Sequence, residues 1–235
     1  MLSGATVLDM FKQAPVKSAL ICLILISLSC GRQEMPVPDQ VLNEARNSVF
    51  IVEGLACGKS SFGTGVLIEE GILTNAHVIA GIEKIEVIDF NGNRSTTYPI
   101  KADFETDLAL LKSPDITITP LQVAEPKENQ RGSILVGGQG FVENIPVTVL
   151  RLLNIVIADI YGEGKHTRSG LELSADVTAG DSGGPIINAK GQVVGLIFSR
   201  STIQNEISYG ISSSEFVKVA EGYDLSGVSS GKCRD

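Results

Sequence analysis

Short apolar runs separated by turn residues form the main pattern of this chain from about residue 48 onward. The runs are rich in Val and Ile, which favour strands, and no helical stretches lie between them. This spacing predicts a mostly antiparallel β fold, either two barrels or a sandwich, rather than an α/β fold. Only the segment SSEFVKVAEGY near the C-terminal end predicts a helix. The predicted strands are SVFIVEG, GTGVLIEE, ILTN, KIEVIDF, LALLK, SILVGG, VTVLRLLNIVIADI, LELSA, GPIIN, GQVVGLIFS and ISYGIS.

The N-terminal segment, residues 1–29, has the polarity pattern of an export signal. Two lysines precede an apolar stretch that ends at Cys30 and is short for a membrane span. With the small Ser29 before the cysteine, the segment resembles a bacterial lipoprotein signal, in which the cysteine is lipidated and becomes the new N-terminus. Ser27 departs from that family, which usually has leucine there. An ordinary secretory signal or an uncleaved anchor is the alternative.

The segment between this signal and the first strand is polar and contains two prolines. Such a composition is typical of a linker, so residues 30–47 are expected to tether the folded domain to a membrane surface. The folded domain is expected to span residues 48–222, followed by a C-terminal tail at 223–235.

Charge and residue content exclude two kinds of site. The net charge is −8 and no run of Lys or Arg occurs, which argues against nucleic acid as a partner. The chain has two histidines, His77 and His166, and neither CxxC nor HExxH, so no metal site and no cofactor are expected. His166 lies in the polar stretch YGEGKHTRSG and is expected to be solvated.

Three short motifs contain candidate chemistry. His77 follows an apolar strand in GILTNAHVI, and Asp107 opens the apolar strand of TDLALLK. A histidine or an aspartate in such a place is more often a hydrogen-bonded polar residue or a turn residue than a catalytic one. Ser182 in GDSGGP is more specific, because glycines on both sides allow close approach of the backbone to a ligand.

Together and in this order, the three motifs resemble those of trypsin-like serine proteases, most closely the protease domain of bacterial HtrA proteins. The similarity extends from about residue 48 to residue 220. It implies a double six-stranded antiparallel β-barrel with a C-terminal helix and an active cleft between the barrels. The implied bounds are 48–113 for the first barrel, 121–212 for the second and 213–222 for the helix.

The resemblance also implies a role for each residue. Ser182 is the expected nucleophile, His77 the general base, and Asp107 the carboxylate that orients the imidazole. The N–H groups of Gly180 and Ser182 are expected to form the oxyanion hole. The expected activity is hydrolysis of peptide bonds in proteins or peptides through an acyl-enzyme. A catalytically silent, lipid-anchored binding protein on the same scaffold is the alternative, although its usual mark is a broken triad.

Substrate preference has two interpretations. The trypsin branch places an acidic pocket floor at the position of Asp176, which would select Arg or Lys. HtrA-like chains often prefer small aliphatic residues, and Arg200 offers a charge that neutralises Asp176. Ile197 and Phe198, in a strand expected to wall the cleft, complete the predicted substrate-binding residues.

Other features of the two protease branches are expected to be absent or undecided. HtrA proteases continue into PDZ domains, for which the residues after 222 leave no room, so none is expected. Asp181 is the residue that pairs with a freed N-terminal amine in the trypsin branch. The sequence IVEG at 51–54 resembles such a terminus, but it is better explained as part of the first strand. Cys57 and Cys233 are candidates for a disulfide, with the pairing left open.

Overall fold

The computed structural model describes residues 37–138 and 141–234. The predicted signal, Cys30 and the first part of the predicted tether lie outside these residues. Within the described ranges, no helix has both the length and the apolar character needed to cross a membrane.

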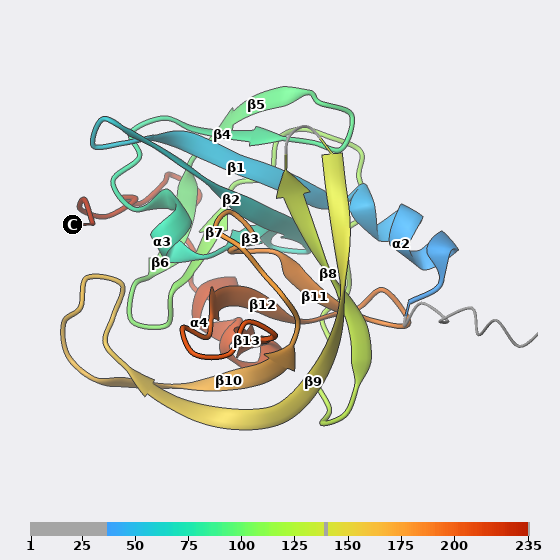
Figure 1. Ribbon diagram of the computed structural model, residues 1–235. Coiled ribbons are helices and arrows are strands. Elements are labelled where there is room, and N and C mark those ends of the chain that lie inside the picture. The colour runs from blue at the N-terminus through green and yellow to red at the C-terminus, as the bar shows by residue number, and fades with distance from the viewer. Residues whose placement is uncertain (1–36, 139–140, 235) are drawn as a thin grey trace, which may run out of the picture. The chain divides into compact units, whose positions relative to one another are not determined.

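The first half of the domain forms a seven-stranded antiparallel sheet (Figure 1). Its strand order is β5-β4-β1-β2-β3-β7-β6, so it has seven strands where six were predicted. With the second half it forms two curled antiparallel sheets, which agrees with the predicted double-barrel architecture. β5 and β6 were not predicted, because RSTT has no apolar residue and PIKAD has no regular alternation. The strands are β1 (Val49–Ala56), β2 (Lys59–Ile68), β3 (Gly71–Thr74), β4 (Ile85–Ile88), β5 (Arg94–Thr97), β6 (Pro99–Asp103) and β7 (Leu108–Leu111).

The second half forms a closed six-stranded antiparallel barrel, as predicted. Its strand order is β10-β13-β12-β11-β8-β9, and the long strand β9 curves around one side of it (Figure 1). Closure leaves no free strand edge in this barrel. The strands are β8 (Arg131–Gly138), β9 (Phe141–Ile157), β10 (His166–Ser174), β11 (Pro185–Asn188), β12 (Val193–Arg200) and β13 (Ile207–Ser212).

A shared apolar core joins the two halves. Leu73 and Leu110 from the first sheet and Leu135 and Ile187 from the second barrel are all fully buried in one cluster. A close-packed interior resists relative movement of the elements that share it, so this core fixes the position of one half against the other. The loops at the junction therefore keep a fixed relative position.

The segment predicted as a tether is partly folded, which is a correction. Helix α2 (Asp39–Arg46) buries Leu42 and Ala45 in the shared core, next to the fully buried Val37. Asp39 in its first turn and Arg46 in its last turn complement the helix dipole. The polar composition of the segment did not indicate a helix, because only two buried side chains dock this helix against the core.

Three short helical turns complete the domain. Helix α3 (Ala76–Ile79) follows β3, where the sequence suggested only a strand end. The predicted C-terminal helix is shorter than expected: it consists of the 3-10 turn η1 (Ser213–Glu215) and helix α4 (Val217–Ala220).

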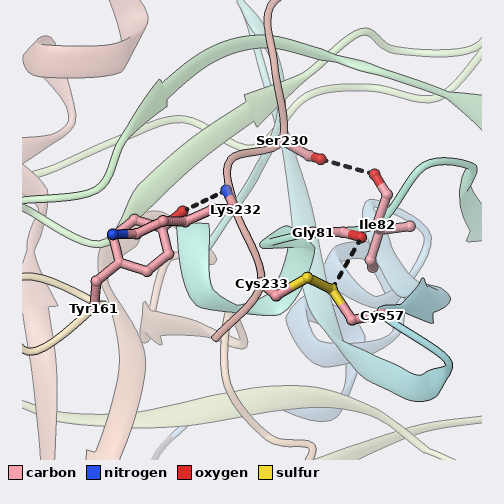
Figure 2. Close-up of a disulfide and its surroundings, with 7 residues drawn as sticks. All are labelled: Cys57, Gly81, Ile82, Tyr161, Ser230, Lys232 and Cys233. Atoms are coloured by element: carbon pink, nitrogen blue, oxygen red, sulfur yellow. Dashed lines mark hydrogen bonds between the residues drawn. A yellow bond between two sulfur atoms is a disulfide. The ribbon is translucent and has the colours of Figure 1, made fainter. Parts of the chain in front are cut away.

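The C-terminal segment folds back along the first sheet and is linked to it by a disulfide between Cys57 and Cys233 (Figure 2). The two Cα atoms are 6.1 Å apart, and 176 positions separate them in sequence. Ser230 Oγ donates to the carbonyl of Ile82 at 2.7 Å, and Lys232 Nζ lies 4.6 Å from the centre of the Tyr161 ring. The structure thus settles the pairing that the sequence left open.

Candidate active site

Asp107 lies in the turn between β6 and β7, and its carboxylate faces His77. His77 Nδ1 is 2.8 Å from Oδ2 and 3.0 Å from Oδ1, and the backbone N–H of His77 donates to Oδ1 at 2.9 Å. The carboxylate is buried, with Asp107 only 5% exposed. A buried carboxylate on Nδ1 fixes the imidazole tautomer that leaves Nε2 free to accept a proton.

The backbone of Asp107 has an uncommon conformation, with φ of 64° in the left-handed region. Such a conformation costs a non-glycine residue about 1 to 2 kcal/mol and persists only where neighbours enforce it. Here Asn75 Nδ2 donates to the carbonyl of Asp107 at 3.0 Å, and Arg168 donates to the carbonyl of Thr106 at 2.7 Å. Hydrogen bonds to both adjacent peptides therefore hold Asp107 in place.

Ser182 lies in a tight turn between β10 and β11. Its carbonyl accepts a hydrogen bond from the backbone N–H of Thr64 in β2 at 2.8 Å. Gly183 has φ of 84°, and a Cβ there would overlap the carbonyl oxygen of Thr64 and lie 2.6 Å from Thr74 Oγ1. Only glycine fits this position, both for its backbone angle and for the space available.

The N–H groups around Ser182 differ in whether they already donate a hydrogen bond. Asp181, Gly183 and Gly184 all donate to backbone carbonyls. By contrast, the N–H groups of Gly180 and Ser182 donate to no group within residues 37–138 and 141–234. Gly180 has φ of 103°, a conformation open mainly to glycine. Two unengaged donors beside Ser182 are what an oxyanion hole requires.

Gly63 in β2 brings the serine turn next to the helix that holds His77. A Cβ at Gly63 would lie 2.8 Å from the carbonyl oxygen of Ser182 and 2.7 Å from a methyl group of Val78 in α3. The turn with Ser182 and the helix with His77 thus approach β2 at the same residue. The fold brings all three predicted triad residues to the junction of its two halves.

Asp181 is bound within its own turn rather than to a chain terminus. Its Oδ2 accepts from the N–H of Thr178 at 2.6 Å and lies 3.3 Å from the Thr178 hydroxyl. The segment IVEG lies inside β1, where it pairs with β2 and partly with β4. The turn is therefore formed without cleavage at Ile51, in agreement with the strand interpretation.

A pocket of about 190 Å³ opens beside Ser182. Its wall includes the predicted Ile197, but Asp176 is exposed and does not line it. Asp181 contributes to the lining, with its carboxylate engaged by Thr178. The remaining lining residues are Val177, Thr178, Ala179, Ser199 and Arg200.

Phe198 lines a second cavity, of about 380 Å³. This cavity also contains His77, Asp107 and Arg168. The Arg168 guanidinium carbon lies 4.2 Å from the centre of the Phe198 ring, a cation–π contact. Phe198 and Ile197 are adjacent in β12 and thus border different cavities.

His166 is not part of this site. Its Nδ1 lies 3.1 Å from a carboxylate oxygen of Glu105, so the expectation that it is merely solvated missed this contact. Across the two described ranges, no group of three His, Cys, Asp or Glu residues has the arrangement needed to hold a metal ion.

A family model described as trypsin-like peptidase domain matches residues 63–196, more than half of the chain and the part that contains His77, Asp107 and Ser182. The chain belongs to the trypsin-like peptidase family. The chain is 31% identical over 186 residues to serine protease Rv3671c of Mycobacterium tuberculosis, covering 76% of this chain and 47% of the relative. It is also 31% identical over 131 residues to the serine protease Do-like HtrB of Bacillus subtilis, covering 53% of this chain and 29% of that relative. The chain thus spans about half the length, or less, of these curated relatives.

Solved structures agree with this family assignment. The crystal structure of the Rv3671c protease from M. tuberculosis in its active form matches with a TM-score of 0.79 and 26% identity, covering 98% of this chain and all of that chain. The HtrA-type protease AlgW with a tripeptide matches with a TM-score of 0.65 and 20% identity, covering 76% and 62%, and shows a common fold.

The sequence motifs did not identify the residues that position the candidate triad. Thr64, Asn75 and Arg168 act through contacts with residues distant in sequence, so no local motif marks them. One signal was present for Arg168: it lies two residues before Gly170, which is also buried in β10, and residues two apart share a face of a strand. An arginine on the inward face of a strand needs a specific partner.

Proposed function

We propose that this protein is a serine endopeptidase that hydrolyses peptide bonds through an acyl-enzyme at Ser182. The contact of the His77 imidazole with the buried Asp107 carboxylate, at 2.8 Å, is the observation that supports the proposal most strongly. A scaffold kept only for binding would have no need of that contact or of the left-handed backbone that provides it.

In the proposed reaction, His77 Nε2 takes the proton from the Ser182 hydroxyl as its oxygen attacks the substrate carbonyl. Asp107 stabilises the imidazolium that forms. His77 then passes the proton to the leaving amine as the peptide C–N bond breaks, and water hydrolyses the acyl-enzyme by the same route.

The tetrahedral oxygen formed in each half of the reaction needs hydrogen-bond donors that are already oriented. The unengaged N–H groups of Gly180 and Ser182 are assigned to this oxygen. Loss of one such donor typically costs about 2.7 to 4 kcal/mol of transition-state stabilisation. The glycine backbone of the turn serves this purpose.

The 190 Å³ pocket beside Ser182 is assigned to the side chain that precedes the scissile bond. Its walls are apolar at Val177, Ala179 and Ile197, and Arg200 contributes a positive charge. An incoming Lys or Arg would meet that charge, and Asp181, the carboxylate of the lining, already accepts hydrogen bonds from Thr178 through its Oδ2. The proposed preference is for small or medium apolar side chains, rather than the basic preference that Asp176 suggested.

We also propose that the enzyme is exported and held at the bacterial cell envelope by lipid on Cys30. The N-terminal charge and apolar pattern supports this proposal, together with relatives such as the probable periplasmic serine endoprotease DegP-like of Halomonas elongata. Expression of Cys30→Ser in a bacterial host tests the lipid. Release of the variant from membranes supports the anchor, and membrane retention equal to that of wild type contradicts it.

Cleavage of an unfolded protein substrate tests the activity. Reduced, carboxymethylated protein should be cut by the wild-type enzyme and left intact by Ser182→Ala. Ser199→Ala, which changes another serine at the same pocket, should retain cleavage. Equal cleavage by wild type and Ser182→Ala would indicate a contaminating protease, and no cleavage by wild type would favour the silent binding scaffold.

A further inference from the structure

Arg168 is a buried arginine without a carboxylate in direct contact. It is 4% exposed, and no ion pair involves it among the residues that the structure describes. Its Nε is also buried without a hydrogen-bond partner in the described chain. Burial lowers the pKa of its guanidinium, while the charges of Asp107, Glu215 and Asp103 act in the opposite direction. Keeping a charge in such a place is costly, so a specific role is expected.

The contacts of Arg168 cross the junction between the two halves of the fold. Arg168 belongs to β10 of the second barrel, whereas the carbonyl that it binds, that of Thr106, lies in the turn between β6 and β7. Thr106 is itself buried, at 1% exposure. The hydrogen bond joins residues 62 positions apart and ties the turn before Asp107 to the barrel that provides Ser182.

This hydrogen bond acts on the peptide group that precedes Asp107. The carbonyl of Thr106 and the N–H of Asp107 belong to the same planar peptide, so fixing the first fixes the orientation of the second. Asp107 adopts its left-handed φ of 64° directly after this peptide. Without Arg168, the two peptides that flank Asp107 would lose one of the hydrogen bonds that hold them, and the Asp107 carboxylate would be positioned less precisely against His77.

The guanidinium of Arg168 also contacts β12, the strand that borders the pocket beside Ser182. The guanidinium stacks on Phe198, and the neighbours of Phe198 in β12, Ile197 and Ser199, line the pocket beside Ser182. One planar side chain thus contacts both the wall strand of the substrate pocket and the turn that positions the triad aspartate. Arginine suits this position because its guanidinium stacks through its flat face and donates hydrogen bonds within its plane, which lysine cannot do.

We propose that Arg168 is a positioning residue of the active site, which holds Asp107 in its catalytic orientation across the barrel junction and links it to the substrate-binding strand β12. The inference rests on the proposed endopeptidase function. It adds to the triad a residue from outside the three sequence motifs.

Two features of the kinetics distinguish a positioning role from general destabilisation. Misplacement of the Asp107 carboxylate should lower the maximal rate and leave the half-saturating concentration nearly unchanged. A lysine at position 168, which keeps a charged hydrogen-bond donor, should restore part of that rate.

Inactivation by diisopropyl fluorophosphate, measured as the maximal rate and the half-saturating concentration from pH 5 to 9, tests this inference. The variants are Arg168→Met, which removes charge and hydrogen bond, and Arg168→Lys, which keeps the charge. Arg151→Met is the control, since Arg151 is an exposed arginine on the adjacent strand β9, paired with Glu172. Circular dichroism at the assay temperature gives the folded fraction to which each rate is normalised.

For Arg168→Met we expect a maximal rate reduced roughly 10- to 100-fold, because small misplacements of catalytic groups have effects of this size. Its half-saturating concentration should stay within about twofold of wild type. Arg168→Lys should lose about three- to tenfold in maximal rate. Arg151→Met should match wild type.

Wild-type maximal rates in both Arg168 variants would overturn the inference. If Arg168→Met does not fold, a wild-type rate in Arg168→Lys overturns it alone. An effect confined to the half-saturating concentration would assign Arg168 to ligand binding instead. Failure of the wild-type enzyme to react at all would contradict the proposed function, which is a different result.

Discussion

The backbone N–H of Thr64 donates to the carbonyl of Ser182 at 2.8 Å, which joins the first sheet to the turn of the candidate nucleophile. The carbonyl of Thr64 accepts a hydrogen bond from Oγ1 of Thr74 at 2.7 Å, and Thr74 lies three positions before His77 in the sequence. Its hydroxyl accepts from the N–H of Gly137 in the second barrel at 2.9 Å. Thr64 therefore fixes both candidate catalytic segments to a single point in β2.

Substitution of Gly183 should separate the effect of this contact from that of backbone angle. Gly183 and Gly92 both have φ of 84°, but a Cβ at Gly92 meets no atom within 4 Å, whereas one at Gly183 overlaps the carbonyl of Thr64. Gly92→Ala should lower the free energy of unfolding by about 1 to 2 kcal/mol. Gly183→Ala should lower it by about 3 kcal/mol or more, because overpacking adds to the strain. Urea unfolding measures both, and equal losses would contradict the account of the turn.

Removing the disulfide should destabilise the whole domain. A cross-link typically contributes about 2 to 5 kcal/mol, and long loops lie at the upper end. The double variant Cys57→Ser/Cys233→Ser should show a loss in that range and no response to dithiothreitol. Ser230→Ala removes only one hydrogen bond of the same segment and should cost about 1 kcal/mol. A wild-type protein whose unfolding midpoint is unchanged by dithiothreitol would argue against the cross-link.

Glu215 should contribute to acid sensitivity. Burial raises its pKa, but the hydrogen bonds from Lys218 and from Ser169, whose N–H donates at 2.6 Å, outweigh burial and lower the pKa below the usual 4.5. A lowered folded-state pKa contributes stability above pH 4.5, which is lost as the pH falls through the lower value. Glu215→Gln should be less stable than wild type at pH 7, and the two proteins should converge towards pH 3. A difference in unfolding free energy that stays constant over this range would contradict the assignment.

The pocket beside Ser182 should select apolar side chains. In a peptide library, cleavage after Val, Ala or Leu should be enriched, and Asp176→Ala should leave the profile unchanged, because Asp176 lies outside the pocket. Arg200→Ala should increase the relative cleavage after Lys and Arg, since a repelling charge is removed. Enrichment of Arg or Lys with the wild-type enzyme, lost in Asp176→Ala, would restore the trypsin-like interpretation.

The candidate triad was predictable because each of its residues lies in a short local motif. The strands were predictable for the same reason, since alternation and Val or Ile content are local properties. What the sequence could not show depends on contacts between distant segments. Helix α2 looks polar until the core around Leu42 is known, and nothing near Arg168 in sequence indicates Thr106 as its partner. Closure of a sheet likewise depends on pairing between strands far apart in the chain.

The central claim of the proposed function is that Ser182 is a nucleophile activated by His77. Intact-mass analysis after reaction with diisopropyl fluorophosphate at pH 8, followed by peptide mapping, tests this claim most directly. Wild type should gain one phosphoryl adduct at Ser182, while Ser182→Ala and His77→Ala, both folded by circular dichroism, should gain none. A folded wild-type protein that gains no adduct, or an adduct on another residue that persists in Ser182→Ala, would contradict the account.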